Sequence, residues 1–349
     1  MNTDNRSLLV AALVTSAVAL LDALVAGPTI LIGLLIVGPL LAAVNLDGWR
    51  TALVAVYALA LAILLGLADG IFGTVDHLVG CLVVATGGVF CVVIGERRSE
   101  REQTLLRVTR VAEVAQRAIL RPVPARVGRV AFAVRYLSAA EEAVVGGDFY
   151  DVAVTPRGVR LVVGDVKGKG LEAVQLAATV LGSFRQAAFT SPDLVDLAAE
   201  LDRSTSRQLG EEDFVTAVLA EFGPRGELRL VNCGHPPPLL FRGGAAWPLT
   251  GRGPTTPLGL EPVPVLEQVE LVPADRLLLY TDGLVEARDG QGRPFALSDR
   301  AAALLTGPSL DDALDRLVAD VLAHAGGQLD DDMALVLAQP RRQMLRRAA

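Results

Sequence analysis

The first 95 residues are dominated by long apolar runs that contain very few charges. These runs cover roughly Ser7–Ala26, Thr29–Val44, Arg50–Ala68 and His77–Gly95. Several approach the ~20 residues that an α-helix needs to cross a bilayer core, and the second run is the shortest. A cleaved signal peptide explains one such run but not four. We therefore predict a transmembrane domain of four helices over residues 1-95, with a buried helical bundle as the alternative.

Basic residues flank these runs on one side only. Arg6 precedes the first run, Arg50 lies between the second and third, and Arg97 follows the fourth. The loops on the other side, which begin with Gly27-Pro28, contain no lysine or arginine. This asymmetry predicts a multi-pass plasma-membrane protein with its N-terminus and everything after residue 95 in the cytoplasm. Asp22, inside the first run, is a candidate for a functional intramembrane carboxylate.

Residues 96-122 follow a different pattern, which is charged and helical. Apolar side chains recur at alternating spacings of three and four, at Leu105, Val108, Ala112, Ala115 and Ile119. Such a seam is typical of a coiled coil, so we expect a helical stalk that forms a homodimer. On so short a seam, an amphipathic helix packed on the following domain is an equally good interpretation.

From residue 123 to residue 340, short apolar runs alternate with turns, which is typical of strands mixed with a few helices. Strand-like segments are Val127–Tyr136, Phe149–Val154, Val159–Val163, Phe214–Phe222, Glu227–Val231, Leu239–Phe241, Leu277–Tyr280 and Ala334–Ala338. Helical segments are Leu171–Phe189, Ser191–Leu209 and Ser309–His324. Strands on either side of a helical pair predict an α+β domain over residues 123-340. We interpret the basic tail, residues 341-349, as a solubilising end, with contact to anionic lipid as the alternative.

Acidic residues stand at the ends of several of these strands. The segment Val144–Gly170 predicts a β-hairpin in which Asp148 precedes the first strand and Asp165 follows the second. Far downstream, Asp282 follows one strand and Asp331 precedes another. Carboxylates at strand ends beside glycines suit hard divalent cations. Together they predict a site for two Mg²⁺ or Mn²⁺ ions that activate a water for in-line attack on a phosphate.

Composition argues against several other classes of function. The chain has 349 residues, a net charge of −7 and a mean hydropathy of +0.44, with the apolar excess at the N-terminus. The negative charge argues against nucleic acid as a partner. Cys81, Cys91 and Cys233 form neither a disulfide framework nor a metal-ligand cluster. Cys233 also lacks activating neighbours other than His235, which argues against a cysteine nucleophile.

Five motifs, taken in order, resemble a known family. They are GGDFYD at 146–151, GDVKGKG at 164–170, NCGHPPPLL at 232–240, LLLYTDGLVEARD at 277–289 and DDDMALVLA at 330–338. Over about residues 116–339 they look like the SpoIIE/RsbU-type branch of the metal-dependent protein serine/threonine phosphatases, the PPM family. The resemblance implies an αββα sandwich, with helices outside two stacked antiparallel sheets.

The same resemblance implies a site and a substrate class. The metal ligands would be Asp148, Asp165, Asp282 and Asp331, together with the backbone carbonyl of Val166. In the DDDM motif the second aspartate fits the family best. Substrates would be phosphoserine or phosphothreonine proteins, in this branch typically STAS-domain anti-anti-sigma factors. Once dephosphorylated, these bind an anti-sigma kinase and free a sigma factor.

Some residues depart from the family pattern or have no settled role. Gly-Lys-Gly at 168–170 stands where many relatives have Gly-His-Gly, so Lys169, with Lys167, either binds phosphate or is a solvated loop charge. His235 in the GHPP turn is expected to shape its loop rather than act as a general acid, because no orienting partner is visible. Asp151 is a candidate for a residue that supports the metal ligands without binding the ions itself.

Two alternative functions remain. GGDFY resembles the GGDEF signature of diguanylate cyclases, but that interpretation leaves Asp282 and Asp331 unexplained. A non-catalytic receptor with a phosphatase-like domain would bind partners without turnover. The full set of candidate ligands favours the enzyme over both alternatives.

Overall fold

The computed structural model describes residues 3–25, 32–138, 146–210, 213–251, 253 and 255–341. The chain divides into two compact units, Met1–Arg107 and Val108–Ala349, each of which is described by itself. Three sequence predictions lie outside the described residues: the loop Gly27-Pro28, the start of the hairpin at Val144-Val145, and the basic tail after Arg341.

The first unit consists of apolar helices. These are α1 (Thr3–Val25), η1 (Ile32–Ile36), α2 (Val37–Asn45), α3 (Gly48–Ala68) and the first part of α4 (Val75–Ile119). In the described part of the chain, α1, α3 and α4 are long and apolar enough to cross a membrane. The second predicted span is instead the shorter stretch Ile32–Asn45. Proline fits only the first turn of an α-helix, so Pro39 restricts α2 to a start at Val37 and a 3₁₀ segment precedes it.

Small residues lie where the helices of the first unit meet. A Cβ atom added to Gly66 of α3 would lie 2.0 Å from Nε2 of His77 in α4, and one added to Gly87 would lie 1.9 Å from Cδ1 of Ile36. Glycine at these positions lets apolar helices approach closely, as is common in membrane proteins. Gly66 and Gly70 form a GxxxG pair in the sequence, but Gly70 lies beyond α3, and no atom of the described residues lies within 4 Å of a Cβ added there.

The second unit contains two sheets in which neighbouring strands pair antiparallel. The six-stranded sheet has the order β1 (Arg126–Val127), β2 (Val130–Leu137), β11 (Met333–Pro340), β10 (Arg276–Tyr280), β7 (Leu239–Arg242) and β8 (Ala245–Pro248). The five-stranded sheet has the order β3 (Phe149–Thr155), β4 (Gly158–Val166), β5 (Val215–Phe222), β6 (Glu227–Cys233) and β9 (Glu267–Glu270).

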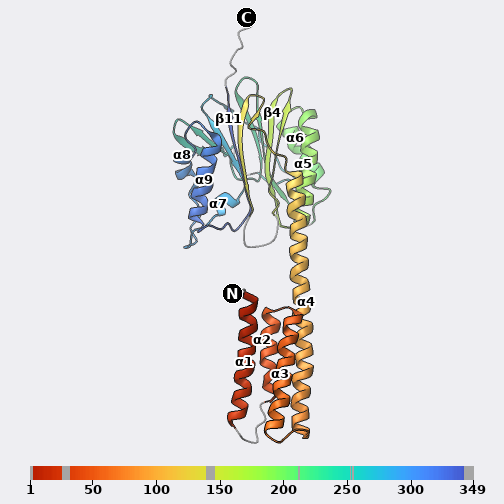
Figure 1. Ribbon diagram of the computed structural model, residues 1–349. Helices are drawn as coiled ribbons and strands as arrows, with labels where there is room; N and C mark the ends of the chain where they lie inside the picture. Colours follow the sequence, from red (N-terminus) through yellow and green to blue (C-terminus); the bar gives the residue numbers. More distant parts are fainter. Residues whose placement is uncertain are drawn as a thin grey trace. The chain divides into compact units, whose positions relative to one another are not determined.

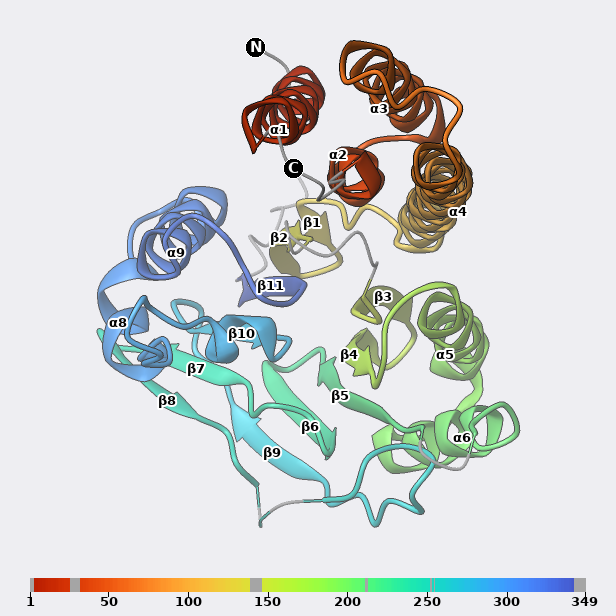
Figure 2. The ribbon, with the colours of Figure 1, turned by 90° about the horizontal axis from the view of Figure 1, so that it is seen from below.

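Helices cover the outer face of each sheet (Figures 1 and 2). The pair α5 (Leu171–Thr190) and α6 (Leu194–Thr205) packs on the five-stranded sheet, and α8 (Leu297–Leu304) and α9 (Leu310–His324) pack on the six-stranded sheet. A third apolar cluster fills the space between the sheets, with Leu161, Val218 and Val336 among its fully buried members. The predicted α+β domain is therefore confirmed, and its layers run helix, sheet, sheet, helix.

The predicted elements and the observed ones differ mainly at the margins. The strands β8 and β9 and the helices α7 (Gly283–Glu286) and α8 were not predicted. The strand β9, EQVE, alternates half-buried and exposed positions and is largely charged, so its pattern is that of a polar loop. The helix α6 starts at Leu194 rather than Ser191, because Asp193 is its N-cap and accepts hydrogen bonds from the N–H groups of Val195 and Asp196.

The predicted stalk seam has two different environments along α4. Ala112 is buried, and it packs with Ala115 and Ile119 against Val174 of α5. This part of the seam is therefore the amphipathic helix packed on the following domain. Leu105, earlier in the seam, is 67% exposed. A homodimer through the stalk stays a prediction.

Candidate metal centre

Three of the four predicted aspartates lie together. Asp148, Asp165 and Asp282 each offer a carboxylate oxygen, and these oxygens all lie within 4.8 Å of one another. Asp148 directly precedes β3, and Asp282 lies between β10 and α7. Asp165 is the penultimate residue of β4 rather than a residue beyond it, because β4 continues to pair with β5 through Val166. The cluster therefore joins one end of the five-stranded sheet to one end of the six-stranded sheet.

Strand register explains why Asp148 and Asp165 meet. In the antiparallel pair β3–β4, Phe149 lies opposite Gly164, so the residues just outside this pair fall at the same end of the hairpin. Gly147 then passes so close to β4 that an added Cβ would lie 2.6 Å from both Cβ and the carbonyl oxygen of Val166. A side chain at position 147 would push the loop that carries Asp148 away from this edge.

A threonine links the cluster across the two sheets. The Thr281 hydroxyl donates to Oδ2 of Asp148 over 2.7 Å, and its oxygen accepts from the N–H of Ala334 over 2.8 Å. Because the Ala334 N–H fixes the direction of the hydroxyl, Asp148 is held as a hydrogen-bond acceptor. Sequence reasoning missed Thr281, although it directly precedes Asp282 in the TDGL motif.

The consecutive aspartates at 330–332 differ in burial and in their contacts. Asp331 lies outside the three-carboxylate cluster, and its Oδ1 is 3.2 Å from Nζ of Lys169. Asp332 is buried, and its Oδ2 accepts from the Tyr136 hydroxyl over 2.6 Å and from the Gly146 N–H over 3.0 Å. Asp332 therefore fastens the loop before Asp148 to the start of β11, a role that nothing in the sequence pattern indicated.

The end of α4 reaches the same loop. The Gln116 amide donates to the Tyr136 hydroxyl over 2.6 Å and to the carbonyl oxygen of Gly146 over 3.0 Å. Gln116 is itself almost fully buried. The loop that leads into Asp148 is thus held on one side by Asp332 and on the other by Gln116.

Burial and mutual repulsion raise the pKa values of the clustered carboxyl groups. Desolvation raises the pKa of Asp148 well above its usual value, and the neighbouring charge of Asp165 raises it further. Desolvation followed by the charge of Asp282 raises the pKa of Asp165 to about 7. The pKa of Asp282 is raised by desolvation and by Glu286. Such a cluster requires protons or cations to offset its charge, and an all-oxygen set of this kind suits Mg²⁺ or Mn²⁺.

The raised pKa values predict how stability depends on pH when metal is chelated. Asp165 carries a proton in the folded protein at pH values where the unfolded chain has lost it. The resulting stabilisation is complete below the unfolded pKa of about 4 and is lost as pH rises through about 7. In EDTA, the melting temperature of the second unit should therefore fall between pH 5 and pH 8, and Asp165→Asn should flatten that dependence. An equally steep fall in the Asn variant would contradict the assignment.

The comparisons with known proteins agree with this geometry. The family model described as Stage II sporulation protein E (SpoIIE) matches residues 155–341, which is more than half of the chain. The chain belongs to the SpoIIE family. It therefore carries a serine/threonine phosphatase domain of the PPM type with an acidic metal site, preceded by apolar helices that suggest membrane anchoring.

Solved structures resemble this SpoIIE-family domain. The RsbU and RsbW domains of Rv1364c from Mycobacterium tuberculosis match at 30% identity and a TM-score of 0.51, covering 61% of this chain and 60% of that chain. The SiaA-PP2C domain of Pseudomonas aeruginosa matches at 22% identity and a TM-score of 0.57, covering 70% and 99%. The phosphatase domain and regulatory fragment of SpoIIE from Bacillus subtilis match at 17% and 0.51, covering 60% and 63%. The structures from Pseudomonas aeruginosa and Bacillus subtilis show only that the fold is shared. This chain covers about three fifths of the length of the Mycobacterium tuberculosis protein chain.

The structure also shows the contacts of two other candidate residues of the SpoIIE-family domain, His235 and Asp151. His235 is buried between the sheets, where one ring nitrogen lies 3.0 Å from the Thr216 hydroxyl and the other 3.0 Å from the carbonyl oxygen of Tyr280. Burial lowers the pKa of His235 to about 3, so the ring is neutral, and it has two orienting partners that the sequence did not reveal. Asp151 accepts from Arg185 of α5 over 2.5 Å rather than from a residue of the metal cluster.

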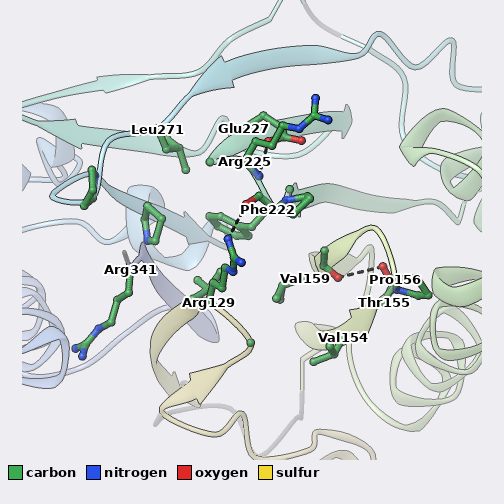
Figure 3. Close-up of a pocket in the computed structure, with 18 residues that line it drawn as sticks. Arg129, Val154, Thr155, Pro156, Val159, Phe222, Arg225, Glu227, Leu271 and Arg341 are labelled. Atoms are coloured by element: carbon green, nitrogen blue, oxygen red, sulfur yellow. Dashed lines mark hydrogen bonds between the residues drawn. The ribbon is translucent and has the colours of Figure 1, made fainter. Parts of the chain in front are cut away.

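A separate cavity of about 500 Å³ has none of the clustered aspartates in its lining (Figure 3). Its lining includes Thr155 at the end of β3, Gly158 at the start of β4 and Arg341 just after β11. The candidate ligands lie at or near the opposite ends of the same strands. These are Asp148 for β3, Asp165 for β4 and Asp331 for β11. The cavity therefore opens at the opposite end of the sandwich and takes no part in the candidate metal centre.

Proposed function

We propose that this chain is a membrane-anchored protein serine/threonine phosphatase that depends on two Mn²⁺ or Mg²⁺ ions. The observation that carries the proposal is the cluster of Asp148, Asp165 and Asp282 within 4.8 Å. Asp331 and the backbone carbonyl of Val166 complete the proposed ligand set. Bound divalent ions in such a centre activate a water nucleophile and offset the charge of a phosphate group.

The chain itself holds the candidate ligands in position. Thr281 fixes the carboxylate of Asp148, and the close approach of Gly147 to Val166 sets the width of the site. Because Cys233 is fully buried and burial raises its pKa to about 12, it offers no thiolate for a covalent route. Direct attack by water is therefore the route that the residues of this domain support.

We further propose that the substrate is a phosphorylated STAS-domain regulatory protein. The family supports this proposal, as does the relative from Mycobacterium tuberculosis, in which an RsbU domain and an RsbW domain belong to one protein. We also propose that the phosphatase domain is cytoplasmic, because Arg6, Arg50 and Arg97 all flank the apolar segments on one predicted side. The short stretch Ile32–Asn45 would complete the membrane domain.

Hydrolysis assays on the full chain in detergent separate this function from its alternatives. We expect release of phosphate from a phosphoserine peptide and from p-nitrophenyl phosphate in Mn²⁺ and none in EDTA. A diguanylate cyclase would consume GTP instead, and a receptor would do neither. Absence of metal-dependent hydrolysis on every phosphoserine protein tested would contradict the proposal.

A further inference from the structure

Both lysines of this chain lie in one short loop. Every other basic side chain that stays charged at neutral pH is an arginine. Lys167 and Lys169 flank Gly168 between β4 and α5, immediately after Asp165 and Val166. The loop therefore places two ammonium groups next to the candidate metal centre.

The two lysines contact different partners. Gly168 has a φ of +106°, a conformation that favours glycine, so the chain changes direction between them. Nζ of Lys167 lies over the ring of Phe214, 5.3 Å from its centroid. Nζ of Lys169 lies 3.2 Å from Oδ1 of Asp331, and both side chains are 35% exposed. Lys169 thus pairs with the fourth predicted ligand.

Asp331 belongs to the electrostatic environment of the cluster. Its charge raises the pKa of both Asp165 and Asp282. The ammonium of Lys169 partly neutralises that charge, and it contacts the carboxylate through which Asp331 would bind an ion. A lysine ammonium beside a carboxylate makes binding of a divalent cation to that carboxylate less favourable, because the two positive charges repel.

We propose that Lys169 is a positioning residue that competes with a divalent cation for Asp331 and so sets the affinity of the more weakly held ion. This inference rests on the proposed two-ion site. Lys169 holds the Asp331 side chain toward the β4–α5 loop, and ion binding transfers that carboxylate from the ammonium to the metal.

Calorimetric titration of the full chain in detergent with Mn²⁺ tests the proposal. Lys169→Met should tighten the weaker Mn²⁺ site by about tenfold, the size expected for removing one nearby charge in a partly exposed site. Lys169→Arg, which keeps the charge, should stay close to the parent. Lys167→Met is the matched control and should change the affinity by less than about threefold, because its ammonium lies over Phe214.

The outcomes distinguish this inference from the proposed function. If the parent chain binds no Mn²⁺, the two-ion site itself is wrong. If the parent binds two ions and Lys169→Met leaves the weaker affinity unchanged or lowers it, only the role of Lys169 is wrong.

Amine-selective acetylation gives a second readout that needs no substitution. The chain offers two lysines and its N-terminus, so mass spectrometry resolves each site. Adding Mn²⁺ should speed acetylation of Lys169 several-fold relative to Lys167, because the ammonium loses Asp331 as its partner. An unchanged or slower rate at Lys169 would overturn the proposal.

Discussion

Replacing Asp165 by asparagine should lower Mn²⁺-dependent phosphate release by about a thousandfold. The amide keeps the size of the side chain but removes one of the three charges of the carboxylate cluster. Metal ions in hydrolytic sites contribute several kcal/mol to the transition state, and each ~1.4 kcal/mol corresponds to about tenfold in rate. The measurement is release of phosphate from a phosphoserine substrate by the purified full chain.

Asp330→Asn is the matched control for this substitution. Asp330 belongs to the same acidic triplet as Asp331 but is exposed and lies outside the carboxylate cluster. Its variant should keep at least about half of the parent rate, in line with the small effects usual for surface substitutions. A loss in Asp330→Asn as large as that in Asp165→Asn would show that the cluster is assigned incorrectly.

The largest expected effect on stability comes from a buried ion pair in the five-stranded sheet. Arg160 of β4 is fully buried, and its Nε donates to Oε2 of Glu221 over 2.8 Å. Its Nη1 donates to the carbonyl oxygens of Ala188 and Ser191, each over 2.9 Å. Arg160 therefore connects the sheet to the last turn of α5 and to the segment that joins α5 and α6.

Arg160→Met should lower the free energy of unfolding of the phosphatase domain by about 3 kcal/mol. The substitution leaves a buried carboxylate short of one partner and buried carbonyl groups unpaired. Arg229, which donates to Oε1 of Glu221 over 2.6 Å, limits the loss. Urea unfolding followed through Trp247 measures it, in a Trp49→Phe background so that one tryptophan reports on this domain.

An exposed ion pair provides the comparison for Arg160. Arg203 and Glu200 pair on the surface of α6, so Arg203→Met should cost less than about 1 kcal/mol. If Arg160→Met cost no more than Arg203→Met, the buried pair would not stabilise the contact between the helical pair and the sheet.

Most of the fold follows from patterns that repeat within single elements. The hairpin β3–β4 was predicted because β-branched runs flank the turn Pro156-Arg157-Gly158, and register then places Asp148 beside Asp165. Edge strands such as β9 could not be predicted from these patterns, because one face of the strand is solvated and its pairing partner is distant in sequence. The stretch Ile32–Asn45 is as apolar as its neighbours, so its break into two helices depends on the local effect of Pro39.

The candidate site could be predicted only in part, for a similar reason. Asp148, Asp165 and Asp282 were recognisable because each stands next to a glycine or a strand end. The pairing of Asp331 with Lys169 and the bonds from Tyr136 and Gly146 to Asp332 depend on contacts across more than a hundred residues of sequence. Periodicity carries no information on which of three consecutive aspartates turns inward.

The number of Mn²⁺ ions bound per chain tests the central claim most directly. Equilibrium dialysis of the full chain, followed by metal analysis, should give two ions for the parent and for Asp330→Asn, and fewer for Asp165→Asn. Two ions bound equally well by Asp165→Asn, or none bound by the parent, would contradict a metal centre built on Asp148, Asp165 and Asp282.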